Sequence, residues 1–268
     1  SFIGPRPNLF EVSNDPTRKR LEVRQPILKN SDLDKIKYIS EISDSHFTSK
    51  VLDTTYNSDK GPAGMAQSIQ ALCEKAERSV SNGDNIIILS DRLFGSDRIA
   101  IPALLATAAV HHHLIRKGLR TSVGIVVESA EPREVHHFAV LAGYGAEAIN
   151  PYLAFDTLSD MHSKDLFPKG VDQDQVVNRY IKSIDKGLLK VMSKMGISTY
   201  QSYCGAQIFD AVGLSTEFID QFFTGTATQI EGIGLKEVAE ETFRRHSQAY
   251  SDVAVLRHAL DVGGDYAV

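Results

Sequence analysis

Five of the nine histidines in this 268-residue chain lie in two neighbouring segments, and imidazole is the commonest metal ligand in proteins. The first segment holds His111, His112 and His113, and the second holds His136 and His137. Helical side chains share a face only when they lie three or four positions apart, and consecutive side chains diverge by about 100°. Neither segment alone predicts a metal site. The spacing favours rings that pack and hydrogen-bond to the protein, with His111 and His112 inside and His113 near solvent.

One metal site stays open as an alternative, because it takes one histidine from each segment. His112 would bind the ion together with His136 or His137, and Glu128 would add a carboxylate ligand. Such a site would make the chain an autonomous α/β enzyme. The histidine spacing favours the packed arrangement over this one.

Three carboxylates stand at the ends of apolar runs that are typical of buried strands. They are Asp53, Asp91 and Glu128. Enzymes with parallel α/β folds carry their catalytic residues at the carboxyl ends of the strands, so this placement is compatible with catalysis. Placement alone defines no reaction.

A second group of reactive side chains lies in the segment SKMGISTYQSYCGAQIF. It consists of Lys194, Ser198, Tyr203, Cys204 and Gln207. No recognisable motif places a base beside a nucleophile here, and a cysteine next to a glycine is typical of packing. The Gly-rich segment TGTATQIEGIGLKEVAEE has neither the GxGxxG nor the Walker spacing of a phosphate-binding loop, and it predicts a turn.

Composition excludes several classes of protein. The formal net charge is -5 and basic residues do not cluster, which argues against nucleic-acid binding. No apolar run approaches the roughly 18 residues of a membrane helix, so we expect a cytosolic protein. Two cysteines, Cys73 and Cys204, provide no disulfide framework. The first residue is Ser1, and the chain stops shortly after a Gly-Gly pair, which suggests a piece of a longer protein.

The elements that would position these residues follow an alternating pattern. Strands are predicted at residues 48–56, 85–91, 122–129 and 146–152, and helices between them begin near Pro62, Pro102 and Pro132. Glu131 and Glu134 would favour the positive end of the third helix. Repeated strand–helix–strand units with right-handed crossovers predict an α/β fold with a parallel sheet.

The regions on either side are less regular. The expected organisation is an extended arm over residues 1–46, an α/β body over 47–212 and a helical linker over 213–268. The arm carries one short helix at 30–41, capped by Asn30 or Ser31. Further along we predict a polar loop at 158–170, a long helix at 172–195 that Gly187 interrupts, a strand at 196–202, helices at 205–213, 215–223 and 235–250, and a loop at 223–234.

Long stretches of the chain closely resemble the central domain of the glutamate synthase large chain. The resemblance is carried by LDTTY, GPAGMAQSIQALC, IPALLATAAVHHHLIRKGLRTSVGIVVESAEPREVHHFAVLAGYGAEAINPYLA and KGLLKVMSKMGISTYQSYCGAQIFDAVGL. The arm FIGPRPNLFE and the segment FTGTATQIEGIGLKEVAEETFRRH are similar too, so the resemblance covers essentially the whole chain. It implies that the α/β body is an incomplete, TIM-barrel-like sheet.

The resemblance implies a place in an amino-donor oxidoreductase that makes two glutamates from glutamine and 2-oxoglutarate. In that family a glutaminase domain with a catalytic first cysteine precedes the central domain, and an FMN-binding barrel with a 3Fe-4S cluster follows it. Ammonia passes internally between the two sites. Electrons come from NADPH through a small subunit or from ferredoxin, and the location is cytoplasmic or, in a plant-type enzyme, the plastid.

This chain lacks the first cysteine, the closely spaced cysteine trio and the flavin barrel. We therefore expect no catalytic residue, no cofactor and no metal in the piece itself, which would be inactive alone. The leading hypothesis is a scaffold that holds the glutaminase and FMN-binding domains in register. Lys194, Met195, Gly196 and Ser198 are the residues expected to lie near the flavin domain, because a glycine breaks the chain there between helix and strand.

Overall fold

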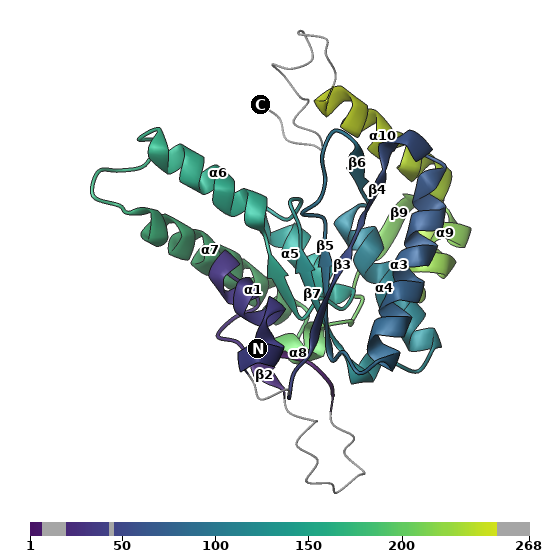
Figure 1. The fold of residues 1–268 in the computed structure, drawn as a ribbon, viewed down its shortest axis with the longest axis horizontal. Coiled ribbons are helices and arrows are strands. Elements are labelled where there is room, and N and C mark those ends of the chain that lie inside the picture. Colours follow the sequence, from purple (N-terminus) through teal and green to yellow (C-terminus); the bar gives the residue numbers. More distant parts are fainter. Residues whose placement is uncertain (7–19, 43–45, 251–268) are drawn as a thin grey trace, which may run out of the picture.

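Four parallel strands form the centre of the fold in the computed structural model, which describes residues 1–6, 20–42 and 46–250. Every residue of the two middle strands is buried, as expected for a parallel sheet that is covered on both faces. The predicted α/β fold is confirmed, and the described sheet is open, as in an incomplete barrel (Figure 1). In order across the sheet, the strands are β3 (Ser49–Asp53), β5 (Ile86–Ser90), β7 (Gly124–Glu128) and β8 (Ala148–Asn150).

Three crossover helices cover one face of this sheet. They are α3 (Gly64–Ser81), α4 (Ala103–Arg116) and α5 (Val135–Gly143), and each connects two parallel strands as predicted. Because side chains alternate along a strand, only every second strand residue meets these helices. Ile87, Leu89 and Val127 belong to the larger hydrophobic cluster on this side.

The N-terminal arm covers the opposite face. Its helix α1 (Asn30–Lys37) buries Leu33 and Ile36 in a second cluster with Ile88 and Val126 of the sheet. In a closed barrel this face would line the interior. The described part of the arm therefore does more than extend from the body, because it fills the space that an incomplete barrel leaves open.

The helix ends differ from the sequence-based expectation. Neither Asn30 nor Ser31 caps α1, which follows Lys29 without a side-chain cap. Glu131, expected at the start of the third crossover helix, instead accepts a 2.8 Å hydrogen bond from the backbone nitrogen of Ala103. It thus serves the first turn of α4, which is close in space but almost thirty positions away in the chain.

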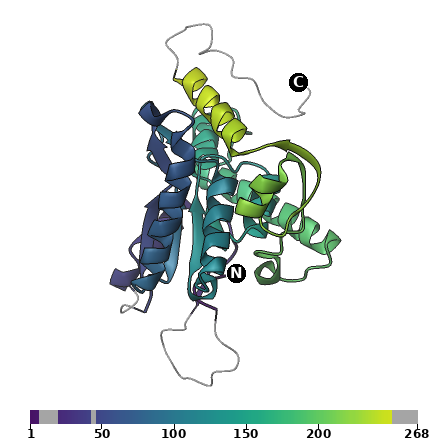
Figure 2. The ribbon, with the colours of Figure 1, turned by 90° about the vertical axis from the view of Figure 1, so that its right-hand side faces the viewer.

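The other described elements surround this two-sided core. No helix among the described residues is long and apolar enough to cross a membrane. Both views show helix α10 (Leu235–Ala249) at the upper end of the molecule (Figures 1 and 2). The elements that surround the core are β1 (Phe2–Ile3), β2 (Leu21–Glu22), α2 (Ile39–Ile42), β4 (Thr55–Asn57), η2 (Ser58–Lys60), β6 (Arg98–Ala100), η3 (Arg120–Ser122), α6 (Tyr152–Ser163), α7 (Gln173–Lys194), α8 (Tyr200–Tyr203), β9 (Asp210–Leu214), α9 (Thr216–Phe222), β10 (Ala227–Ile233) and α10 (Leu235–Ala249).

Two local predictions before residue 204 are wrong. The predicted polar loop at 158–170 starts inside helix α6, whose first turns are held by the buried side chains of Tyr152 and Phe155. The predicted strand at 196–202 is absent, and α8 lies at its end. Both segments are polar and short, so packing against the core decides their conformation rather than local propensity.

Two further predictions, beyond residue 204, are also wrong. β9 replaces the helix predicted at 205–213, and β10 replaces the loop predicted at 223–234. Within the described part of the chain, these strands pair only with each other, in parallel, and a Cβ on Gly232 would overlap the carbonyl of Gly213. Pairing between segments this far apart leaves little local signal.

The predicted 212/213 boundary falls inside β9, residues 251–268 lie outside the described part, and the three-part division stays a prediction.

Gly187 does not interrupt α7, but it lets α5 approach closely. A Cβ at this position would overlap the side chain of Val135. Alanine normally stabilises a helix by about 1 kcal/mol relative to glycine, whereas overpacking costs about 1–3 kcal/mol. We expect Gly187→Ala to lower the free energy of unfolding by about 1 kcal/mol in urea titrations. Ser183→Ala, at an exposed position of the same helix, is the control, and a stabilised Gly187→Ala protein would contradict the close approach.

Candidate functional site

Two buried carboxylates mark the carboxyl edge of the parallel sheet, where α/β proteins carry their functional residues. Glu128 is the last residue of β7 and Asp91 directly follows β5. Their residues are only 2% and 3% exposed. The sequence predicted both at this edge, and the structure brings them to adjacent strands.

Glu128 is held by three neighbours on the protein. One oxygen accepts a 2.9 Å bond from the ammonium of Lys37 and lies 3.5 Å from Nε of Arg92. The other accepts a 2.6 Å bond from the hydroxyl of Ser90. Because Lys37 ends helix α1, this ion pair ties the arm to the sheet.

Asp91 is bonded just as fully. Its carboxylate accepts from the hydroxyls of Ser129 at 2.6 Å and Tyr152 at 2.7 Å, and from the backbone nitrogen of Ala130. Burial raises the pKa of Asp91, and these hydrogen bonds oppose that rise. The guanidinium of Arg92 lies 4.1 Å from the centre of the Tyr152 ring, which links the two carboxylates into one network.

The third predicted carboxylate, Asp53, is also engaged. It forms a short ion pair with Arg98 and accepts hydrogen bonds from the backbone and hydroxyl of Thr55. All three carboxylates at this edge therefore bind groups of the same chain. In this arrangement they join the arm, the strands and the following loops rather than presenting free oxygens to a substrate.

The two inner histidines are packed as predicted. Nδ1 of His111 accepts a 2.9 Å bond from Nε of Arg120, and the amide nitrogen of Gln207 lies 3.3 Å from Nε2 of His112. Burial, aided by nearby arginines, lowers the pKa of His111 to about 2 and that of His112 to about 4. Both rings are therefore neutral near pH 7. His113 is the most exposed of the three and pairs with Glu77 at 2.8 Å.

The alternative metal site is not formed. Within residues 1–6, 20–42 and 46–250, no three His, Cys, Asp or Glu side chains are grouped so as to hold a metal ion. His112 lies near the C-terminal end of α4, which leads toward the amino edge of the sheet, whereas Glu128 ends β7 at the carboxyl edge. His136 instead faces the ring of Phe209.

A buried ion pair at the amino edge was missed by the sequence analysis. Glu147 is fully buried, and it accepts a 2.9 Å bond from the backbone nitrogen of Gly4. Its other oxygen lies 3.7 Å from Arg120, which also donates to two backbone carbonyls. A single glutamate inside the apolar segment GAEAIN is the only signal in the sequence. This pair fixes the start of the arm, as Lys37 and Glu128 fix its end.

The thiols are not arranged for nucleophilic chemistry. Burial raises the pKa of Cys204 to about 12 and that of Cys73 to about 11, so both stay protonated near neutral pH. Cys204 donates to the carbonyl of Ala146. Of the other reactive residues in that segment, Tyr203 is buried and Gln207 bonds to His112 and to the carbonyl of Thr224.

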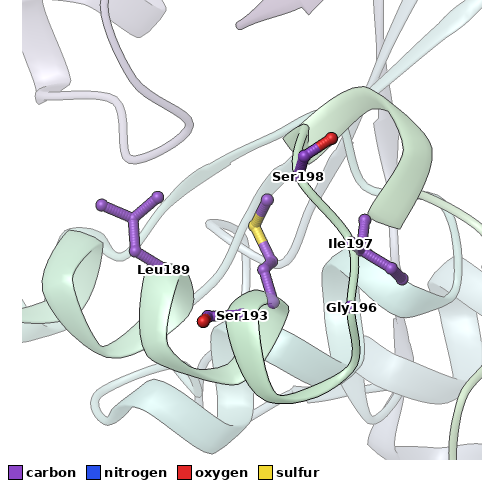
Figure 3. Close-up of a pocket in the computed structure, with 6 residues that line it drawn as sticks. Leu189, Ser193, Gly196, Ile197 and Ser198 are labelled. Carbon is purple, nitrogen blue, oxygen red and sulfur yellow. The ribbon is translucent and has the colours of Figure 1, made fainter.

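The C-terminal end of α7 borders a surface hollow of about 350 Å³ (Figure 3). Gly196 and Ser198 line it, and Figure 3 shows them on the loop that leaves the helix. Gly196 has a φ of 71°, which favours glycine and ends the helix. Lys194 and Met195 stand beside the hollow, and Met195 is 45% exposed. The remaining lining residues are Leu189, Met192, Ser193 and Ile197.

Comparison with known proteins places this architecture in a family. Residues 1–215 match the family model described as the glutamate synthase central domain. The chain is 44% identical to the glutamate synthase (NADPH) large chain of Bacillus subtilis, over 99% of this chain and 17% of that protein. It is 39% identical to the glutamate synthase (NADH) of Schizosaccharomyces pombe, over 99% and 12%. It is 40% identical to the ferredoxin-dependent glutamate synthase of Pyropia yezoensis, over 99% and 18%. The chain thus spans less than a fifth of each relative.

Removal of the Lys37 ammonium tests the ion pair that ties the arm to the sheet. Lys37→Met leaves Glu128 buried with fewer partners, and we expect it to lower the free energy of unfolding by about 3 kcal/mol. Lys37→Met combined with Glu128→Gln should lower the free energy of unfolding by less than the sum of the two single changes, because the double variant has no unpaired carboxylate at position 128. Urea titrations of all four proteins give the coupling energy, and strict additivity would show that the pair contributes nothing.

The buried histidines predict a pH-dependent stability. The pKa of His112 falls from 6.5 to about 4 in the folded protein, so between these pH values the unfolded chain binds a proton that the folded chain does not. The contribution of neutral His112 to the free energy of unfolding is therefore complete above pH 6.5 and is lost as the pH falls toward 4. As the pH falls through this range, the free energy of unfolding of wild type should drop by up to about 1.4 kcal/mol per pH unit more than that of His112→Gln. The free energy of unfolding of both proteins is measured by urea titrations at several pH values. If it falls equally steeply with pH in the two proteins, the lowered pKa of His112 is disproved.

Proposed function

Because this chain belongs to the glutamate synthase central-domain family, we propose that it is the connecting domain of a glutamate synthase. In the proposed enzyme it holds a glutaminase domain and an FMN-binding synthase domain in register. The whole protein would convert glutamine and 2-oxoglutarate into two glutamates with internal transfer of ammonia. The 268 residues alone would be inactive.

The observation that carries this proposal is the way the carboxyl edge of the sheet is used. Glu128 and Asp91 sit where a parallel α/β enzyme would place catalytic groups, yet they bind Lys37, Ser129 and Tyr152 of the same chain. Fully bonded buried networks rigidify a domain. A rigid domain suits a protein that must keep two distant sites at a fixed separation, so that ammonia released at one reaches the other.

The proposed enzyme needs FMN and a 3Fe-4S cluster, and we place both outside this chain. Iron–sulfur clusters are held by cysteine thiolates, and a cysteine-ligated 3Fe-4S cluster requires three of them. This chain has only Cys73 and Cys204, and both are buried. When bound, the flavin would supply the electrons that reduce the condensation product of ammonia and 2-oxoglutarate.

The relatives leave the source of electrons open, since their names include NADPH, NADH and ferredoxin. We propose the glutaminase and FMN-binding domains of the same polypeptide as partners, and a small subunit or ferredoxin as electron donor. We propose a cytoplasmic location, or a plastid for a plant-type enzyme, since the name of the rice relative includes the word chloroplastic.

We also place the hollow at the end of α7 near the FMN-binding domain. Leu189 is 62% exposed and Met195 is 45% exposed, and exposed apolar side chains beside a hollow are typical of contact surfaces. Lys194 adds a positive charge that can bind acidic groups of a partner. Gly196 and Ser198 form the loop on the other side of the hollow.

Replacement of Lys194 and Met195 by alanine in the full-length enzyme tests this contact. Glutamine-dependent glutamate formation should fall by about tenfold, equivalent to about 1.4 kcal/mol, while glutamine hydrolysis itself continues. The measurement is the ratio of glutamate formed to glutamine hydrolysed. Lys164→Ala with Leu166→Ala, which removes an exposed Lys and an exposed apolar side chain between α6 and α7, is the matched control. Unchanged turnover and unchanged coupling in the Lys194/Met195 variant would remove the hollow from the proposal.

A further inference from the structure

The turn between β5 and β6 exposes two large apolar side chains at the carboxyl edge of the sheet. Leu93 is 62% exposed and Phe94 is 40% exposed. They are adjacent in sequence and follow the buried Asp91 and the exposed Arg92. Exposure of single apolar residues is common, but an adjacent leucine and phenylalanine on one turn is a candidate contact surface.

This turn is held firmly at both ends. The backbone nitrogen of Phe94 donates to the carbonyl of Asp91 at 2.9 Å, and Gly95 and Arg98 exchange two backbone hydrogen bonds. Asp91 is anchored by Ser129 and Tyr152. A pre-organised turn loses little conformational entropy when a partner packs on it.

The end of helix α10 lies against the same turn. Nε2 of His246 is 2.8 Å from the carbonyl oxygen of Gly95, the residue after Phe94. The ring of Tyr250 lies 4.8 Å from the His246 ring and is 42% exposed. Figure 1 shows the end of α10 beside the β6 region, at the upper end of the molecule. The last described residue of the chain therefore stands next to the exposed turn.

We infer that Leu93, Phe94 and Tyr250 form the docking surface for the polypeptide that follows α10. This inference rests on the proposed function, in which that polypeptide is the FMN-binding domain. The chain leaves the described structure at Tyr250, so whatever follows is tethered beside the surface at a high effective concentration. Aromatic residues are enriched at the centres of such interfaces. Arg92, whose side chain is 42% exposed, supplies a polar rim.

The test uses Leu93→Ser with Phe94→Ser in the full-length enzyme. Arg245 lies near the end of α10, one residue before His246, with its side chain 76% exposed, and the docked domain would restrict the access of trypsin to it. We expect the double variant to be cut there about five- to thirtyfold faster than wild type, the range for an interface weakened by one or two interactions. Leu166→Ser is the matched control, because Leu166 is also 62% exposed, and it should be cut at the wild-type rate.

Tyr250→Ser provides a second, independent variant if the double variant does not fold, and it should also accelerate cleavage. Cleavage of the folded variants at the wild-type rate would overturn the proposed docking surface. A change in oligomeric state by analytical ultracentrifugation, with unchanged cleavage, would also overturn it by showing that a second copy of the protein occupies the surface. Either result leaves the proposed connecting role intact if the ratio of glutamate formed to glutamine hydrolysed is unchanged. Failure of the connecting role would change that ratio and would not change the rate of cleavage.

Discussion

The structure depends on one constraint, which is that both faces of a parallel sheet must be kept from water. The strands β5 and β7 are buried along their whole length, so a single layer of helices cannot cover them. The crossover helices cover one face, and the arm covers the other with Ile3, Leu33 and Ile36. Each fully buried side chain of this kind contributes about 1.5–3 kcal/mol. A few such residues in the arm therefore outweigh any one ion pair, and apolar burial holds the arm in place.

Buried polar contacts then decide where along the sheet the arm lies. Hydrophobic burial is non-directional, whereas a buried carboxylate must be bonded at one position. Glu147 binds Gly4 at the amino edge, and Glu128 binds Lys37 at the carboxyl edge. Between them, the backbone of Leu28 donates to Ile149. The arm is thus fixed at three points along the sheet, and Glu128, which stands where a catalytic group could lie, serves this register instead.

The same reasoning explains where the protein offers contact surfaces. The buried carboxylates and histidines described above are bonded to other groups of the chain, so the surfaces that a partner can contact lie on the periphery. They are the hollow beyond Met192 and the turn that carries Leu93 and Phe94. One stands at the end of α7 and the other beside the end of α10, both at positions where the chain leaves a helix. A connecting domain of this kind would bind its neighbouring domains at these two peripheral surfaces, and its packed core would keep the surfaces at a constant separation.

The sequence by itself determined the parallel sheet, its crossover helices and the family, because apolar periodicity and long runs of similar residues are local signals. It also determined that consecutive histidines on α4 cannot share a metal, which follows from helix geometry alone. Only the tertiary structure decided that Glu131 serves α4, that β9 pairs with β10, and that Glu147 and Arg120 hold the arm. Each of these joins residues far apart in the chain, and no local pattern encodes which distant partner satisfies a buried charge or an open strand edge.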